Sequence, residues 1–402
     1  MISKCSGLWA LLGSVLLAAC GGGDAPVPGS GAPSGSPTAK GNFSALVTFG
    51  DSLSDQGSYA PATSLSGDGQ APYFGGKFTV NLDGNAGTIW VENLAATLGL
   101  AVFPAEVGFA GSSVKCPVKF VVPAAAARCT SYGQGGSRVT HPNGIGHTTA
   151  SGAAAALTVP MVSQIDNHLA AFGGKFNATD LVFVWGGNSD VFAQFAGFGA
   201  AAAQIQAHAV AGKISADEAK KQLYDAQTAA QQGMKHAAQA LSAAVRDKIL
   251  AKGGQYVAVV NLPDSAATPF GGTLSADARG VITVLVDTFN LWLRDGLSNQ
   301  PVLWLDQNAS FKDAFANPAK YGFTERTLPI CDADKIKLIT GGAITDGSSL
   351  FCNGTPGMRY NGTRTGADAT TWAFADGVHP SLGGHKVIGN FMVQQLKAAG
   401  WI

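Results

Sequence analysis

A serine, a carboxylate and an imidazole occur in two short motifs near opposite ends of the chain. Ser52 follows a short apolar run, and Asp376 precedes His379 by three residues. A serine hydroxyl is a weak nucleophile until an adjacent base takes its proton, and histidine suits that role because its pKa lies near neutrality. A carboxylate beside the ring fixes the tautomer and stabilises the imidazolium. The two motifs therefore predict a serine hydrolase that uses Ser52, His379 and Asp376.

The composition fits a globular chain and favours no particular partner. Among 402 residues, 26 Lys+Arg balance 26 Asp+Glu, and only 13% of residues are charged. The sequence contains no cluster of basic residues, so it gives no reason to expect nucleic acid as a ligand. No repeat or second linker divides residues 42–402, which predicts one catalytic domain over that span.

The N-terminal part has the layout of an export signal followed by a tether. A short basic start and a short apolar run predict a signal peptide at residues 1–19, because the run is too short to cross a bilayer comfortably. The end of this run, Leu17-Ala18-Ala19-Cys20, resembles a bacterial lipobox, which implies lipid attachment to the Cys20 thiol. By the same resemblance, the Gly21 that follows fits export to the outer membrane instead of inner-membrane retention. Residues 20–41 are rich in Gly, Pro and Ser, as in a flexible tether.

We therefore expect an exported protein of the cell envelope, held to the membrane through its N-terminal lipid. An ordinary signal peptide with an incidental cysteine is the alternative. The exported setting also permits disulfides among the four cysteines beyond Cys20. Three pairings are possible, and we favour the local pairs, each of which closes a modest loop: Cys116–Cys129 and Cys331–Cys352. A zinc site is the alternative, but no Cys/His spacing supports it, and we expect no metal.

Short apolar runs alternate with helical patterns along the rest of the chain. Strands are predicted at 45–49, 181–185, 256–260 and 302–305, and helices at 88–98, 192–252, 281–297 and after Ser381. Gly212 and a capping-box pattern from Ser215 to Glu218 divide the longest region into two helices. Fully apolar strands that alternate with helices predict an α/β fold, with a parallel sheet flanked by helices on both faces and long loop insertions.

The two motifs resemble those of the GDSL or SGNH hydrolase family. Gly50-Asp51-Ser52-Leu53-Ser54 matches the first family motif and Asp376-Gly377-Val378-His379 the last, and the resemblance covers nearly all of residues 43–402. The G-x-S-x-G elbow of α/β-hydrolases is not present. The resemblance implies a three-layer flavodoxin-like fold with catalytic loops at the carboxyl edge of the sheet.

The resemblance also implies an oxyanion hole made of the Ser52 N–H, a glycine N–H and an asparagine side chain. Gly136, in the Gly-Gly-small ending of residues 131–137, fits the glycine donor, since backbone must approach the reacting carbonyl closely there. The family's leading asparagine is Ser131 here. A loop glycine with no catalytic part is the alternative.

The asparagine block, residues 185–190, departs further from the family pattern. Aligned on Asp190 without a gap, the asparagine position holds Ser189. Aligned on the preceding glycines, the donor is Asn188. Both side chains can donate a hydrogen bond, and we favour Asn188.

The other candidates are predicted to have structural roles. Asp55 is expected to cap or pair locally, and His385 is a poor competitor for His379. Surface positions are predicted for the remaining histidines: His141, His147, His168, His208 and His236.

These features predict a serine esterase or lipase that hydrolyses carboxylic acyl esters through an acyl-enzyme and needs no cofactor. A phospholipase or acyltransferase and a carbohydrate O-acetylesterase are alternatives, because they share the triad and differ in pocket shape, which the sequence does not reveal. The alternative outside enzymes is an envelope lipoprotein with a binding role. Oligomeric state and the acyl and alcohol parts of the substrate are left open.

Overall fold

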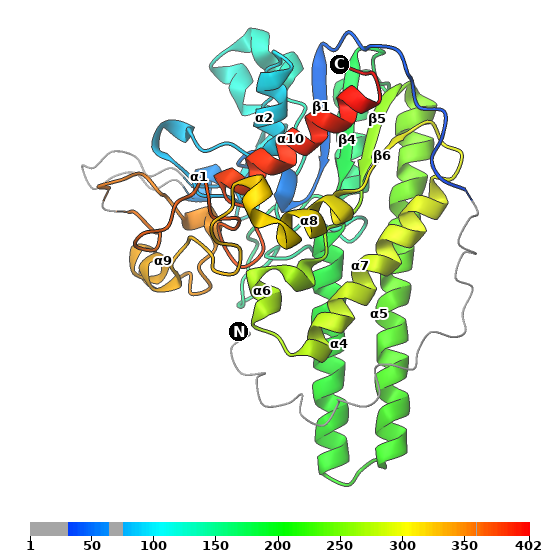
Figure 1. Ribbon diagram of the computed structural model, residues 1–402, viewed down its shortest axis with the longest axis vertical. Helices are drawn as coiled ribbons and strands as arrows, with labels where there is room; N and C mark the ends of the chain where they lie inside the picture. The colour runs from blue at the N-terminus through cyan, green and yellow to red at the C-terminus, as the bar shows by residue number, and fades with distance from the viewer. Residues whose placement is uncertain (1–30, 64–74, 359) are drawn as a thin grey trace.

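The core of the molecule is a parallel sheet of four strands, in the order β1-β4-β5-β6 (Figure 1). The computed structural model describes residues 31–63, 75–358 and 360–402, so the predicted signal peptide and Cys20 lie outside the described residues. The predicted α/β class is confirmed. The strands of this sheet are β1 (Ala45–Gly50), β4 (Asp180–Trp185), β5 (Tyr256–Val260) and β6 (Leu303–Leu305).

The strands are apolar because both faces of the sheet are covered, and every residue of β4 and β5 is buried. The register pairs Ala45 with Asp180 and Gly50 with Trp185, so β1 and β4 end at the same edge. The residues that follow these two strands therefore emerge side by side. This edge brings together the serine motif and the asparagine block.

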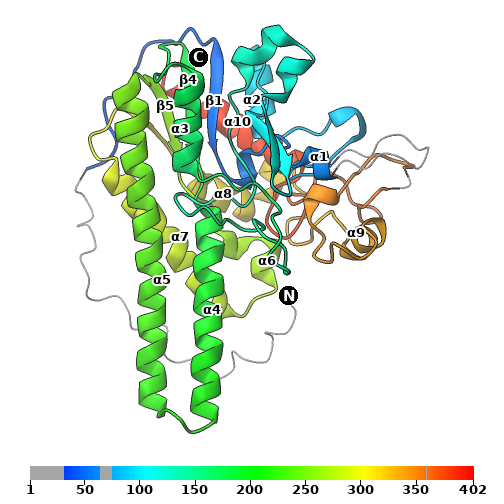
Figure 2. The ribbon, with the colours of Figure 1, turned by 180° about the vertical axis from the view of Figure 1, so that it is seen from behind.

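Helices form a layer on each face of the sheet. On one face lie α3 (Met161–Ala171) and α5 (Ala216–Ala244), and on the other lie α2 (Trp90–Thr97) and α10 (Leu382–Ala398), as Figures 1 and 2 show from opposite sides. The remaining helices are α1 (Ala60–Thr63), α4 (Asn188–Val210), α6 (Pro269–Gly272), α7 (Ala276–Gly296), α8 (Gln307–Ala316) and α9 (Ala333–Ile339).

The long helical region predicted after residue 192 is two helices. α4 and α5 form an antiparallel hairpin that extends well beyond the sheet (Figure 2). The Ser215 hydroxyl caps α5 by accepting a hydrogen bond from the Glu218 N–H at 3.1 Å. The capping pattern therefore located the helix start correctly.

Two irregular insertions are each closed by a disulfide. Cys116 is bonded to Cys129, beyond a small antiparallel hairpin of β2 (Glu106–Phe109) and β3 (Ser112–Lys115), and Cys331 is bonded to Cys352. The second bond belongs to a small apolar cluster with Val80, Ile330, Ile336 and Ala375, separate from the main core. That cluster fixes the segment that leads into Asp376. Within the described residues, no helix is long and apolar enough to cross a membrane.

The predicted surface position of His168 is wrong. His168 is 1% exposed, and its ring stacks between Phe172 and Phe176 with centroid distances of 4.6 and 4.4 Å. Burial lowers its pKa to about 4, so the ring is neutral. The buried positions of α3 are 161, 164, 165 and 168, which form one helical stripe against the sheet. Reading that stripe, and not the polarity of the ring, would have placed His168 inside.

Candidate active site

The structure brings Ser52, His379 and Asp376 into one hydrogen-bonded chain. Nε2 of His379 lies 2.9 Å from Oγ of Ser52, although the two residues are 327 positions apart. On the other side of the ring, Nδ1 lies 2.8 and 2.9 Å from the two carboxylate oxygens of Asp376. With Nδ1–H donating to the carboxylate, Nε2 is free to accept the Ser52 proton. This is the geometry that activation of a serine requires.

The backbone of Gly50 is clamped so that the turn after β1 presents Ser52. The Gly50 N–H donates to Oε1 of Gln164 at 2.9 Å, and the Gln164 amide donates back to the Gly50 carbonyl at 2.8 Å. A Cβ at position 50 would lie 2.3 Å from the Trp185 carbonyl oxygen, so the close approach of β1 and β4 requires glycine. A carboxylate oxygen of Asp51 then accepts from the Leu53 N–H at 3.2 Å and turns the chain.

Asp376 is buried and surrounded by donors. It accepts hydrogen bonds from the N–H groups of Ser349 at 2.9 Å, Val378 at 3.0 Å and His379 at 2.8 Å. Burial alone would raise the pKa of Asp376, but the His379 ring and these hydrogen bonds outweigh it and hold that pKa well below its usual range. The carboxylate is therefore ionised at neutral pH and can orient the imidazole.

The His379 ring also packs against the Phe78 ring, with ring centroids 4.6 Å apart. His385 lies beyond Phe78. Its Nδ1 is 3.3 Å from the Trp90 backbone nitrogen, and its Nε2 is 3.3 Å from the Phe78 carbonyl oxygen. Burial lowers the pKa of His385 to about 3. It is therefore a neutral residue and, as predicted, no competitor for His379, and it supports the residue against which His379 packs.

The Asp55 side chain holds the glycine loop, residues 131–137, beside the serine turn, residues 51–54, which follows β1. One carboxylate oxygen accepts from the N–H groups of Gly57 and Ser58, at 2.9 and 2.7 Å, which is the local pairing predicted. The other oxygen accepts from the Gly135 N–H at 2.8 Å, a link across 80 residues that the sequence did not suggest. Gly136 follows with a φ of +79°, and a Cβ there would lie 2.0 Å from the Ile145 carbonyl oxygen. The conformation of this loop thus depends on glycine.

The asparagine block lies on the opposite side of the serine turn. The backbone N–H and the Nδ2 of Asn188 both donate to Oδ2 of Asp51, each at 3.1 Å. Ser189 is buried next to it at the start of α4. Asp190 then accepts from Nε of Arg138 and from the Val139 N–H, both at 2.9 Å. This last pair joins the asparagine block to the residues just after the glycine loop.

The sequence model of the GDSL-like Lipase/Acylhydrolase family matches residues 46–392. The chain belongs to this family. The match covers both end motifs and everything between them, which establishes an enzyme that hydrolyses esters. No curated protein matches the chain.

The sequence did not predict the roles of several residues that shape this GDSL-family site. Ser349 and Arg138 act through single contacts with Asp376 and Asp190, which no local pattern indicates. Gln164 carried a usable signal, because it is a polar residue at a core position of α3, where a buried amide must find hydrogen-bond partners.

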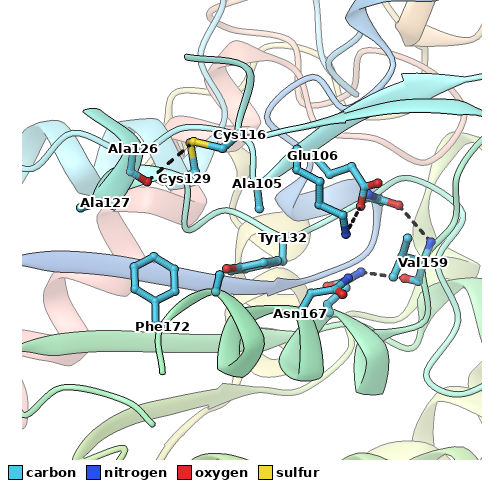
Figure 3. Close-up of a pocket in the computed structure, with 14 residues that line it drawn as sticks. Ala105, Glu106, Cys116, Ala126, Ala127, Cys129, Tyr132, Val159, Asn167 and Phe172 are labelled. Carbon is cyan, nitrogen blue, oxygen red and sulfur yellow. Dashed lines mark hydrogen bonds and ion pairs between the residues drawn. A yellow bond between two sulfur atoms is a disulfide. The ribbon is translucent and has the colours of Figure 1, made fainter. Parts of the chain in front are cut away.

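A cavity of about 320 Å³ lies near the site but is not part of it. Its walls come from the Cys116–Cys129 segment and from α3, together with Tyr132 and with Phe172, which follows α3 (Figure 3). Neither Ser52 nor His379 lines it. Gln164, the residue that clamps Gly50, is also among its lining residues. The cavity therefore shares one residue with the structure that holds the turn carrying Ser52.

Asp55 gives a test of how the GDSL-family site depends on a buried charge. Burial raises the pKa of Asp55 to about 6, although the bonds from Ser58, Gly135 and Gly57 oppose the shift. Because this pKa is higher in the folded state, the stability it contributes is present below about pH 4 and is lost as pH rises through 6. Relative to Asp55→Asn, the wild type should therefore lose about 3 kcal/mol of unfolding free energy over that range.

Urea unfolding of the wild type and of Asp55→Asn at pH values from 4 to 7 measures this difference. Asp217→Asn is the matched control, because the Asp217 side chain is 95% exposed in the first turn of α5. A difference between the wild type and Asp55→Asn that stays constant with pH would contradict the assignment.

Proposed function

We propose that this enzyme is a serine esterase that cleaves carboxylic acyl esters through an acyl-enzyme. The observation that carries the proposal is the continuous chain from Oγ of Ser52 to Nε2 of His379 and from Nδ1 to Asp376. Ser52 would attack the acyl carbonyl while His379 takes its proton and then delivers it to the departing alcohol. Water, deprotonated by the same ring, would release the acid and restore Ser52.

Free hydrogen-bond donors in the serine turn, the glycine loop and the asparagine block support an oxyanion hole between these three segments. The backbone N–H groups of Ser52 and Gly136 have no hydrogen-bond acceptor among the described residues. Free backbone N–H groups, one on the nucleophile and one in the glycine loop, are the kind of donor that a developing oxyanion needs. Asn188 donates to Asp51 from an amide that has two hydrogens, so one remains for the substrate. We assign Ser52, Gly136 and Asn188 as the donors, with Ser189 as the alternative to Asn188.

Separate alanine variants distinguish the two candidates for the side-chain donor. Asn188→Ala should lower kcat by about a hundred- to a thousandfold, because one oxyanion donor is lost. Ser189→Ala, at the neighbouring buried position, should stay within a few fold of the wild type. Steady-state hydrolysis of a chromogenic acyl ester measures both, and circular dichroism checks that each variant is folded. The opposite pattern would transfer the role to Ser189.

A fluorophosphonate probe tests the nucleophile directly. Its phosphorus would bond to Oγ of Ser52 with loss of fluoride, so mass spectrometry of the digested protein should place the adduct on the peptide that contains Ser52. Absence of labelling, together with no turnover of any ester, would favour the binding role. The same preparation then serves for a panel of acyl chain lengths and alcohol groups.

The proposed cellular location guides the choice among substrate classes. Lipid attachment at Cys20 would hold the enzyme at the cell envelope, where short and medium acyl esters, lipids and acylated glycans are accessible. We place a carboxylesterase or lipase-like activity first. The phospholipase, acyltransferase and O-acetylesterase alternatives follow, because an acyl-enzyme can also pass its group to an alcohol. The ester panel separates these by the acyl donor that gives the highest kcat/KM.

A further inference from the structure

Three consecutive apolar side chains are exposed in the loop closed by the Cys116–Cys129 disulfide. Phe120 is 71% exposed, Val121 82% and Val122 50%. Single exposed apolar residues are common on protein surfaces, but a contiguous group marks an interaction site. We call residues 116–129 the docking loop. Its disulfide holds the three side chains at the surface of a short, closed segment.

The charged residues of this loop, and those that follow Glu106 in the chain up to residue 165, are all basic. From residue 107 to residue 165 the sequence contains no Asp or Glu, while it contains Lys115, Lys119, Arg128 and Arg138. Nζ of Lys119 lies 5.0 Å from the centroid of the Phe120 ring. Lys115 contacts Glu106 at 3.2 Å, yet its side chain remains 61% exposed. Aromatic and aliphatic side chains next to lysines are typical of segments that bind at a lipid interface.

The position of the docking loop relates it to both the tether and the catalytic edge. Arg128 donates a hydrogen bond to the carbonyl oxygen of Ser44, the residue just before β1. The loop therefore lies at the end where β1 begins, whereas Ser52 follows the end of β1. In Figures 1 and 2 the cyan loop lies at the same end of the molecule as the C-terminus, with the α4–α5 hairpin tip at the other end. The chain that comes from the predicted tether therefore enters the sheet at the same end of the molecule as the docking loop.

We propose that the docking loop inserts Phe120, Val121 and Val122 into an anionic lipid surface, with Lys115 and Lys119 at the headgroups. In that orientation the amino edge of the sheet faces the bilayer, and Ser52 faces away from it. The enzyme would then act on esters presented from outside the membrane that carries it. A second copy of the chain is the competing occupant of this patch. If two copies met through their docking loops, the lysines of one loop would face the lysines of the other and repel them. The proposal does not depend on ester hydrolysis.

Quenching by brominated lipids tests the contact in the full chain. Vesicles of phosphatidylcholine and phosphatidylglycerol, with and without brominated acyl chains, are combined with the wild type, Phe120→Trp and Val210→Trp. Val210 is the matched control, because it is 78% exposed at the hairpin tip. After subtraction of the signal from the seven native tryptophans, Trp emission from position 120 should be quenched and emission from position 210 should not. Vesicle flotation reports membrane association separately.

Adding Lys115→Gln and Lys119→Gln to the Phe120→Trp chain tests the charges. Each lysine removed should weaken the docked state on anionic vesicles about fivefold and leave neutral vesicles unaffected. A chain that floats without quenching at position 120 would overturn the docking loop while leaving the lipid anchor intact. Failure to float would contradict both. Equal quenching at positions 120 and 210 would refute the orientation, and a dimer that Val121→Ser dissociates would assign the patch to a second copy.

Discussion

Ser52→Ala should lower kcat for ester hydrolysis by about a millionfold, to the level that binding and the oxyanion donors supply alone. The reason is chemical: the variant has no hydroxyl from which His379 can take a proton, so no acyl-enzyme forms. Unfolding free energy should change little, because the Ser52 side chain is only half-buried and makes its one side-chain hydrogen bond to His379. The variant should also fail to react with the fluorophosphonate.

Ser54→Ala is the matched control, two residues further along the same turn. The Ser54 hydroxyl is buried and has no hydrogen-bond partner in the part of the chain that the structure describes. Its removal should leave kcat near that of the wild type and should not destabilise the turn, because an unsatisfied buried hydroxyl contributes no bond. Chromogenic ester assays and urea unfolding on both variants give the comparison. Comparable loss in the two would show that the turn, and not the nucleophile, had been damaged.

The sheet and its edge were predictable from local patterns. Buried strands occur as continuous apolar runs, which predicted the parallel sheet. The family resemblance then implied that Ser52 and Asn188 lie together at the edge where the strands end. Helix starts were also readable where capping residues occur, as at Ser215. The family resemblance extended this to the Asp376–His379 loop, which no strand pattern locates.

The contacts that set the site's geometry were not predictable in the same way. The Asp55–Gly135 and Ser349–Asp376 bonds join segments far apart in the sequence, and either carboxylate has equally plausible local partners. His168 shows the opposite failure: its burial follows from the helical stripe of α3, whereas the polarity of its ring suggested the surface. Residue type alone ranks exposure poorly when a ring can remain neutral inside an aromatic cluster.

Asp376→Asn should lower kcat by about ten-thousandfold at pH 7, with little change in KM. The carboxylate accepts from Nδ1 of His379 and also from the Ser349 and Val378 N–H groups. An amide keeps one acceptor oxygen and puts an NH2 group where donors already point. If that NH2 faces the ring, Nδ1 must accept and Nε2 must carry the proton. His379 then cannot take the proton of Ser52.

The same variant should also lose stability at neutral pH, because the pKa of Asp376 is depressed in the folded state. The stability from such a group is present above the unfolded pKa, near 4, and is lost as pH falls through the folded value. The difference in unfolding free energy between the wild type and Asp376→Asn should therefore be full at pH 7 and shrink in acid. Asp368→Asn, an exposed carboxylate in the same irregular stretch, should leave kcat near wild type. A variant at position 376 that retained a tenth or more of wild-type kcat would mean that the imidazole is oriented by other groups, with Phe78 packing the first alternative to examine.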